Sequence, residues 1–179
     1  MIQSPGVWEM SRAAGLTSLV LFTLAVALGI LTTQRLKARW WPAFVSQELH
    51  RNVSLLAMSF LAIHIVTIVN DKFVRLGSPI PFSSPFRPFW IGIGLVATYL
   101  LVAVLITRLV RRWLPYGGWR AVHWLTYPSW LLAVGHAFGS GTDAGTWWGR
   151  VLVGSCLLLI GAALLIRASP SAGQAFRHS

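Results

Sequence analysis

Five apolar stretches alternate with short polar or basic segments along this chain. They cover residues 13–33, 49–70, 89–110, 120–139 and 147–166. Each is about 20 residues long, the length that an α-helix needs to cross the hydrocarbon core of a bilayer. The segments between them contain the prolines and glycines that favour turns. The pattern predicts an all-α polytopic membrane protein, with residues 1–179 forming one transmembrane domain of five helices.

The composition excludes an ordinary soluble domain. Hydrophobic residues make up 55% of the chain and charged residues 11%, against about 25% charged residues in soluble domains. The net charge of +11 would suit nucleic acid, but the basic residues lie in the short segments between apolar stretches, where topology explains them better. We expect contact with membrane lipid and none with nucleic acid. Cys156 is the only cysteine, so the chain cannot form an internal disulfide.

The distribution of basic residues predicts the orientation of the helices. If the segment after residue 33 is cytoplasmic, that side holds ten of the lysines and arginines and the other side holds five. Cytoplasmic segments carry the excess of positive charge. We therefore expect the N-terminus outside and the C-terminus in the cytoplasm, in a bacterial plasma membrane.

Four of the five histidines lie within two of the apolar stretches. His50 and His64 are 14 residues apart, and His123 and His136 are 13 apart. One span separates the two stretches, so they run in the same direction and the histidines match in depth, at two levels about 20 Å apart. Ionisable residues inside a membrane are costly and usually functional, and imidazole is a common axial ligand of haem iron. We interpret the four as ligands of two haems stacked across the membrane.

The helical angles fit this interpretation only in part. At about 100° per residue, His64 lies within about 40° of the face of His50, whereas His136 lies about 140° from that of His123. The 120–139 span must then be distorted or locally overwound. Pro128 lies between the two histidines and can kink the helix by leaving a carbonyl one turn earlier without its partner. The alternative is that the four are structural histidines, hydrogen-bonded within the bundle. We treat His178, in the polar tail, as a surface residue.

The paired histidines and their surroundings resemble the ferric-reductase-like transmembrane domain, shared by ferric reductases and NADPH oxidases. The resemblance runs from about residue 8 to about residue 166 and is closest to small bacterial members. It is carried by the segments RAAGL, LHRNVSLLAMSFLAIHIVTIV, SPFRPFWIGIGLVA and WRAVHWLTYPSWLLAVGHAFGSGTD. It implies two b-type haems that pass single electrons across the membrane, the inner one bound by His50 and His123 and the outer one by His64 and His136.

The resemblance also implies redox partners. Larger relatives carry a flavin and nicotinamide-nucleotide domain, but this chain ends about a dozen residues after its last span and has no Gly-rich dinucleotide fingerprint. We expect a separate flavoprotein, a quinol or a bound flavin as the electron donor. The acceptor would be chelated ferric iron, oxygen or an extracytoplasmic redox protein. The family's usual first span is also expected to be missing, consistent with an outside N-terminus.

Other residues are candidates for contact with the haems. Haem propionates are anionic and favour cationic partners, and Arg51 and Arg120 flank the inner histidines. Trp130 lies between the two levels, where it would line the path of an electron or serve only in packing. Further candidates are Arg39 for the inner haem, Arg12, Lys72 and Arg87 for the outer haem, Tyr127 beside Trp130, Gly92 and Gly94 for close approach, and Ser140, Thr142 and Asp143 for an acceptor site. For the cations, the alternative is ordinary positive-inside charge with snorkelling side chains.

Two other functions stay open at this point. One is a haem membrane subunit, fed by quinol or flavin, that serves a periplasmic reductase such as that of the bacterial methionine-sulfoxide repair system. The other is a haem-free structural or assembly protein of the membrane. No Ser/His/Asp arrangement, zinc-type cysteine spacing or phosphate loop occurs, so we predict no catalytic side chain. The chain is expected to act as an electron-transport subunit of an oxidoreductase.

Overall fold

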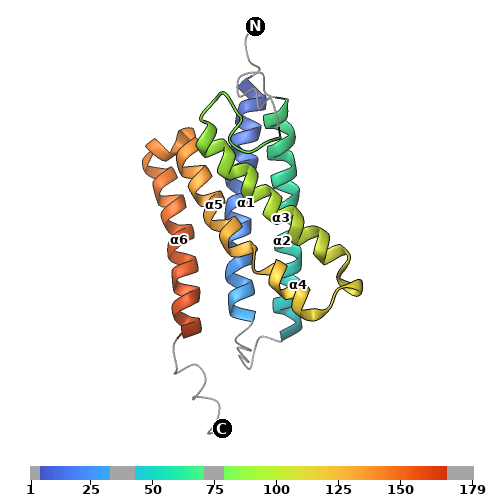
Figure 1. Ribbon diagram of the computed structural model, residues 1–179. Helices are drawn as coiled ribbons and strands as arrows, with labels where there is room; N and C mark the ends of the chain where they lie inside the picture. The colour runs from blue at the N-terminus through green and yellow to red at the C-terminus, as the bar shows by residue number, and fades with distance from the viewer. Residues whose placement is uncertain (1–4, 33–42, 71–78, 169–179) are drawn as a thin grey trace.

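The computed structural model describes residues 5–32, 43–70 and 79–168, and within them every regular element is helical (Figure 1). Six α-helices and two short 3₁₀ helices follow one another. They are α1 (Pro5–Thr32), α2 (Ala43–Val69), α3 (Pro88–Leu109), η1 (Arg111–Trp113), α4 (Tyr116–His123), α5 (Thr126–Ser140), η2 (Thr142–Gly145) and α6 (Trp147–Ala168).

Four of these helices, α1, α2, α3 and α6, are long and apolar enough to cross a membrane. They confirm four of the five predicted spans, with ends that differ by up to eight residues. The largest difference is at α1, which begins at Pro5, eight residues before the predicted start of its span. Proline suits the first turn of a helix. Arg12, in this added part of the helix, pairs with Glu9 one turn away and with Asp143.

The prediction of one continuous helix over 120–139 was wrong, because this passage consists of two helices. α4 ends at His123 and α5 begins at Thr126. Between them, the N–H groups of Leu125 and Tyr127 bond to carbonyls three residues back rather than four. Pro128 has no N–H to offer the carbonyl four residues earlier, and its ring clashes there with a regular helix. The expected distortion is therefore confirmed, and it lies one turn before the proline.

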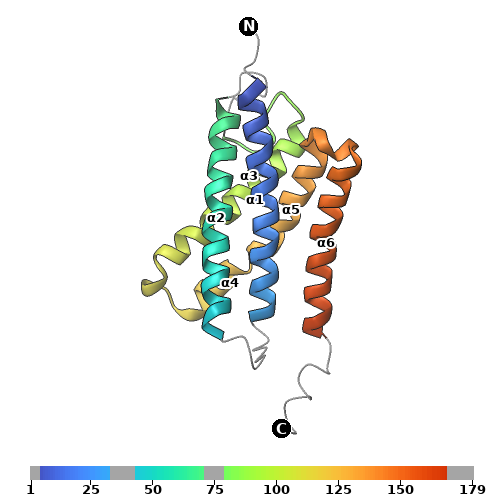
Figure 2. The same ribbon diagram turned by 180° about the vertical axis from the view of Figure 1, so that it is seen from behind.

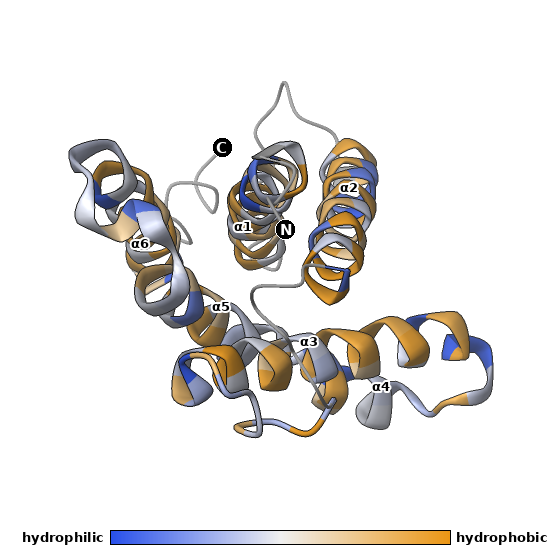
Figure 3. Ribbon diagram, turned by 90° about the horizontal axis from the view of Figure 1, so that it is seen from above, coloured by the Kyte–Doolittle hydropathy of each residue, from blue (hydrophilic) through white to orange (hydrophobic). Residues whose placement is uncertain are grey.

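The helices pass alternately from one end of the bundle to the other. In Figures 1 and 2, α1, α3 and α6 descend, while α2 and the α4–α5 pair ascend, so the two histidine-bearing passages are parallel as expected. α1 lies in the centre, between α2 and α6. Half of its most apolar window is buried, against 11–22% in the other three long helices. Many large hydrophobic residues of those three helices are exposed, and their ribbons are largely hydrophobic in Figure 3, which suits a lipid environment.

Polar side chains link the central helices through the core. Trp130 Nε1 on α5 donates to Thr23 Oγ1 on α1 over 2.9 Å, and both side chains are buried. Ser18 Oγ donates to the Ala57 carbonyl on α2, and Ser129 Oγ to the Ala97 carbonyl on α3. Such bonds strengthen helix association where lipid offers no hydrophobic driving force.

Replacing Thr23 by Val should lower the free energy of unfolding by about 1–3 kcal/mol, because it leaves the buried Trp130 N–H without an acceptor. Thermal unfolding of the detergent-solubilised protein would measure this. Thr67→Val is the matched control, since Thr67 is also buried but its hydroxyl bonds only to carbonyls of its own helix. An equal loss in both variants would contradict the role of the interhelical bond.

Candidate functional site

The structure brings the four histidines together in the two predicted pairs. His50 on α2 meets His123 at the end of α4, and His64 on α2 meets His136 on α5. In both pairs the ring centroids are 6.3 Å apart and the ring planes are inclined by 72°. All four side chains are partly buried. Two similar pairs thus occupy two levels of the bundle, about 20 Å apart by helical rise.

The break between α4 and α5 makes this pairing possible. In a regular helix, His123 and His136 would point to nearly opposite sides. The turn at residues 124–127 is closed by bonds between residues three apart, which advances the chain by about 120° per residue instead of about 100°. This local overwinding, together with the bend, brings both rings to face α2.

Three of the four rings are held through Nδ1 by a backbone carbonyl of a neighbouring helix. His50 bonds to the Ala25 carbonyl over 2.9 Å and His64 to the Ser11 carbonyl over 2.9 Å. His136 bonds to the Trp90 carbonyl over 2.8 Å. A carbonyl can only accept, so Nδ1 carries the proton in each ring. Nε2 is then unprotonated and available to a metal.

A glycine lies four residues after each of these carbonyls, and the imidazole packs against it. A Cβ at Gly15 would come within 2.9 Å of His64 Nδ1, one at Gly94 within 2.5 Å of His136 Nδ1, and one at Gly29 within 3.4 Å of the His50 ring. Gly15 and Gly29 are 14 residues apart, as are His50 and His64 on the antiparallel neighbour. Gly94 was predicted from the sequence as a site of close approach, whereas the two glycines on α1 were not, although their equal spacing indicates them.

His123 is held differently. No ring-nitrogen hydrogen bond joins it to another described residue; instead the ring stacks on the indole of Trp119, with centroids 5.1 Å apart and planes inclined by 20°. Both lie on α4. The inner pair therefore has one ring fixed by a carbonyl and one fixed by an aromatic neighbour.

The spacing within each pair suits two ligands on one iron. A metal–imidazole bond of about 2.0 Å and about 1.1 Å from ring nitrogen to centroid place two such centroids about 6.2 Å apart when the rings bind one metal from opposite sides. Each site offers two nitrogens, and the described residues contain no cluster of three or more metal-ligating side chains. A planar macrocycle that supplies four further nitrogens would complete an octahedral site.

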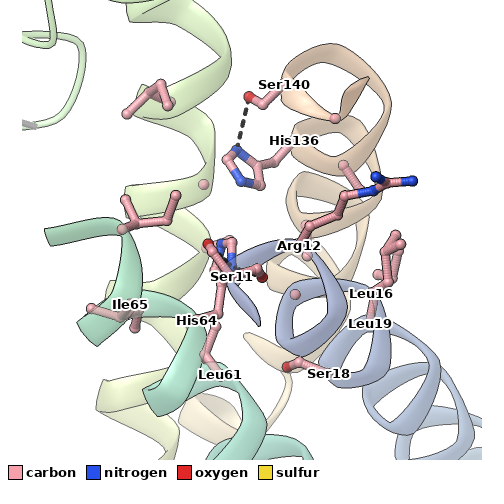
Figure 4. A pocket seen from close by; sticks show the side chains of 18 of the residues that line it. Ser11, Arg12, Leu16, Ser18, Leu19, Leu61, His64, Ile65, His136 and Ser140 are labelled. Atoms are coloured by element: carbon pink, nitrogen blue, oxygen red, sulfur yellow. Dashed lines mark hydrogen bonds between the residues drawn. The ribbon is translucent and has the colours of Figure 1, made fainter. Parts of the chain in front are cut away.

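An apolar cavity surrounds the outer pair. Figure 4 shows His64 and His136 directed into it from α2 and α5, with Ser11 and Ser18 beside them on α1. The Ser140 hydroxyl oxygen lies 3.3 Å from His136 Nδ1, where it accepts a second, longer hydrogen bond from the same N–H. Apolar side chains of the four long helices and α5 form most of the wall, among them Leu19, Phe22, Leu61, Ile65, Ile91, Leu95, Leu101, Ala133 and Val153.

Two of the three predicted cations of the outer level already have partners. Arg12 forms a two-point ion pair with the buried carboxylate of Asp143, with both N–O distances 2.5 Å. Arg87 donates to the Gly139 carbonyl over 2.7 Å. Thr142 and Ser140 line the cavity beside this ion pair. The ion pair therefore closes the outer end of the site. Lys72 lies outside the described residues.

Two of the three predicted cations of the inner level have other contacts. Arg51 is exposed and pairs with Glu48 over 2.6 Å, and Arg120 is exposed and lies over the ring of Trp124. Arg108 at the end of α3 lies instead close enough to interact electrostatically with both His50 and His123. Arg108 was not among the predicted haem contacts. Arg39 lies outside the described residues.

Trp130, a predicted cofactor contact, is placed in the core between α5 and α1, bonded to Thr23. It is not among the residues that line the outer cavity. Tyr127 packs beside the same core. Gly92 accommodates the ring of Phe82 rather than a histidine.

Comparison with protein families identifies the class of protein. Residues 14–134, about two thirds of the chain, match the family described as ferric reductase like transmembrane component, and the chain belongs to this family. The match includes His50, His64 and His123 and ends two residues before His136. No curated protein and no solved structure was found to match the chain significantly.

Membership of this family indicates an integral, multi-pass membrane protein that transfers electrons across the membrane, in agreement with the apolar helices.

Replacing Arg12 by Gln should destabilise the protein by about 1.5–3 kcal/mol, the usual worth of hydrogen bonds to charged groups, because Asp143 would stay buried without its cation. Thermal unfolding in detergent would measure the loss. Arg150→Gln is the control, since Arg150 lies on the same side, is exposed and bonds only to carbonyls of η2 over 3.3 Å. If the two variants unfolded at the same temperature, the ion pair would not be stabilising.

Proposed function

We propose that the protein carries electrons across the membrane by means of two b-type haems. His50 and His123 would ligate the inner haem, and His64 and His136 the outer one. The observation that supports this most directly is that both pairs have the same 6.3 Å ring separation, which matches two imidazoles on one iron. Four structural histidines would need neither this spacing nor its repetition.

The residues of the chain would hold and insulate these groups. The carbonyls of Ser11, Ala25 and Trp90 fix the tautomer and rotation of three rings, which also raises the basicity of Nε2. The apolar wall of the cavity excludes water and lowers the local dielectric constant. Bound haem supplies one-electron chemistry at its iron.

Transfer from the cytoplasm outward is part of the proposal, with α1 beginning outside. The inner pair would then face the cytoplasm, the side to which ten of the fifteen basic residues are assigned, as positively charged cytoplasmic segments require. A separate flavoprotein or a quinol would deliver electrons there. An extracytoplasmic acceptor such as chelated ferric iron, oxygen or a redox protein would take them at the outer pair.

A haem count with a reduced-minus-oxidised spectrum tests the proposal. The purified protein should contain two b-type haems per chain. His64→Ala should remove one and leave most of the other, and His50→Ala should do the same for its own level. His178→Ala is the control and should retain both. Wild-type protein without a Soret band, or full retention in both ligand variants, would refute the proposal.

Gly94→Ala should also lose the outer haem, because the new Cβ would displace the ring of His136. We expect the haem count to fall toward one while the inner haem stays. Gly161→Ala, in α6, is the matched control, since a Cβ there meets nothing within 4 Å. Retention of two haems in Gly94→Ala would show that the close contact does not position the ligand.

A further inference from the structure

The inner end of the bundle gathers cations and an aromatic ring around His123. The end of α3, η1 and α4 come together there (Figure 1). The indole of Trp119 stacks on His123, and the guanidinium carbon of Arg111 lies 4.7 Å from the centroid of the same indole. Arg108 lies within electrostatic range of both inner histidines. Trp119 thus lies directly against His123, with one guanidinium over its indole and a second within electrostatic range of the pair.

The indole nitrogen of Trp119 is buried and has no hydrogen-bond partner. No other buried side-chain nitrogen or oxygen of the described residues is in this state. Leaving a buried donor unpaired costs free energy. An indole N–H can only donate, so the group that would satisfy it must be an acceptor.

Two arginines at this end have no acidic partner in the described part of the chain. Neither Arg108 nor Arg111 forms an ion pair there, whereas Arg12 at the outer level is paired with Asp143 and Arg51 at the inner level with Glu48. Two such guanidinium groups at this end, and an unpaired N–H on the indole that stacks on His123, favour an anionic acceptor. A carboxylate meets both requirements, because it accepts hydrogen bonds and carries negative charge.

We propose that Trp119 anchors the inner haem by donating its indole N–H to a haem propionate, with Arg108 and Arg111 providing the compensating positive charge. This inference rests on the proposed function. It assigns to Trp119 a role as a cofactor-positioning residue, in place of the contacts expected for Arg51 and Arg120. The same side chain stacks on His123. Trp119 would therefore position both the histidine ligand and the haem that this histidine binds.

Trp119→Phe tests the proposal, because phenylalanine keeps an aromatic ring against His123 but removes the N–H. The measurement is the rate at which each haem passes from the detergent-solubilised protein to an apoprotein scavenger. We expect the inner haem to leave about tenfold faster or more, the usual effect of losing a hydrogen bond to a charged group. The outer haem should leave at its original rate, which also shows that the variant is folded. Trp113→Phe is the control, since Trp113 is exposed.

Haem esterified at both propionates separates this role from stacking alone. Reconstituted with the ester, wild type and Trp119→Phe should lose the inner haem at the same rate. An unchanged rate in Trp119→Phe with ordinary haem, or a difference that persists with the ester, would overturn the assignment while two haems per chain still upheld the proposed function. Wild type without haem would instead refute both.

Discussion

The bond from a histidine Nδ1–H to a helix carbonyl organises this bundle. A polar ring inside an apolar bundle needs a partner, and the carbonyls of Ser11, Ala25 and Trp90 provide it with the lone pair that their own helix does not use. In each case the residue four positions later is a glycine, whose missing side chain lets the imidazole approach. The packing of α1 on α2 and the orientation of the rings are therefore set by one repeated interaction.

The break in the fourth passage solves a second geometric problem. Fourteen residues nearly restore a helical face, which lets a straight α2 present both of its histidines to one side. Thirteen residues do not, so the partner passage has to change its winding between His123 and His136. Pro128 enforces that change locally. The tighter turn adds the rotation that thirteen residues of regular helix lack. Together with the bend, it gives both histidine pairs the same ring-centroid separation.

The spans and the pairing of the histidines were predictable because both depend on spacing along one helix. Hydropathy marks the spans, and a two-level match between parallel helices follows from counting. The residues around the pairs were harder to predict, because they come from other helices. Arg51 and Arg120 were chosen as sequence neighbours of ligands, yet one residue along a helix turns the side chain by about 100°, and both are exposed. Gly15 and Gly29 could have been found from their 14-residue spacing, which repeats that of His50 and His64 on an antiparallel neighbour. Trp119 gave no signal beyond that of an interfacial aromatic residue.

The charged side chains at the two ends of the bundle differ in the partners that they have. At the outer end, Asp143 neutralises Arg12 within the chain, and no buried polar side chain of the described residues there lacks a partner. At the inner end, the excess of arginine agrees with a cytoplasmic position, but topology requires only that positive charge lie on that side. It does not require Arg108 to lie within electrostatic range of both inner histidines, nor a buried indole N–H on the ring that stacks on His123 to remain unpaired. Those two features are local, and an anion held at the inner site explains both.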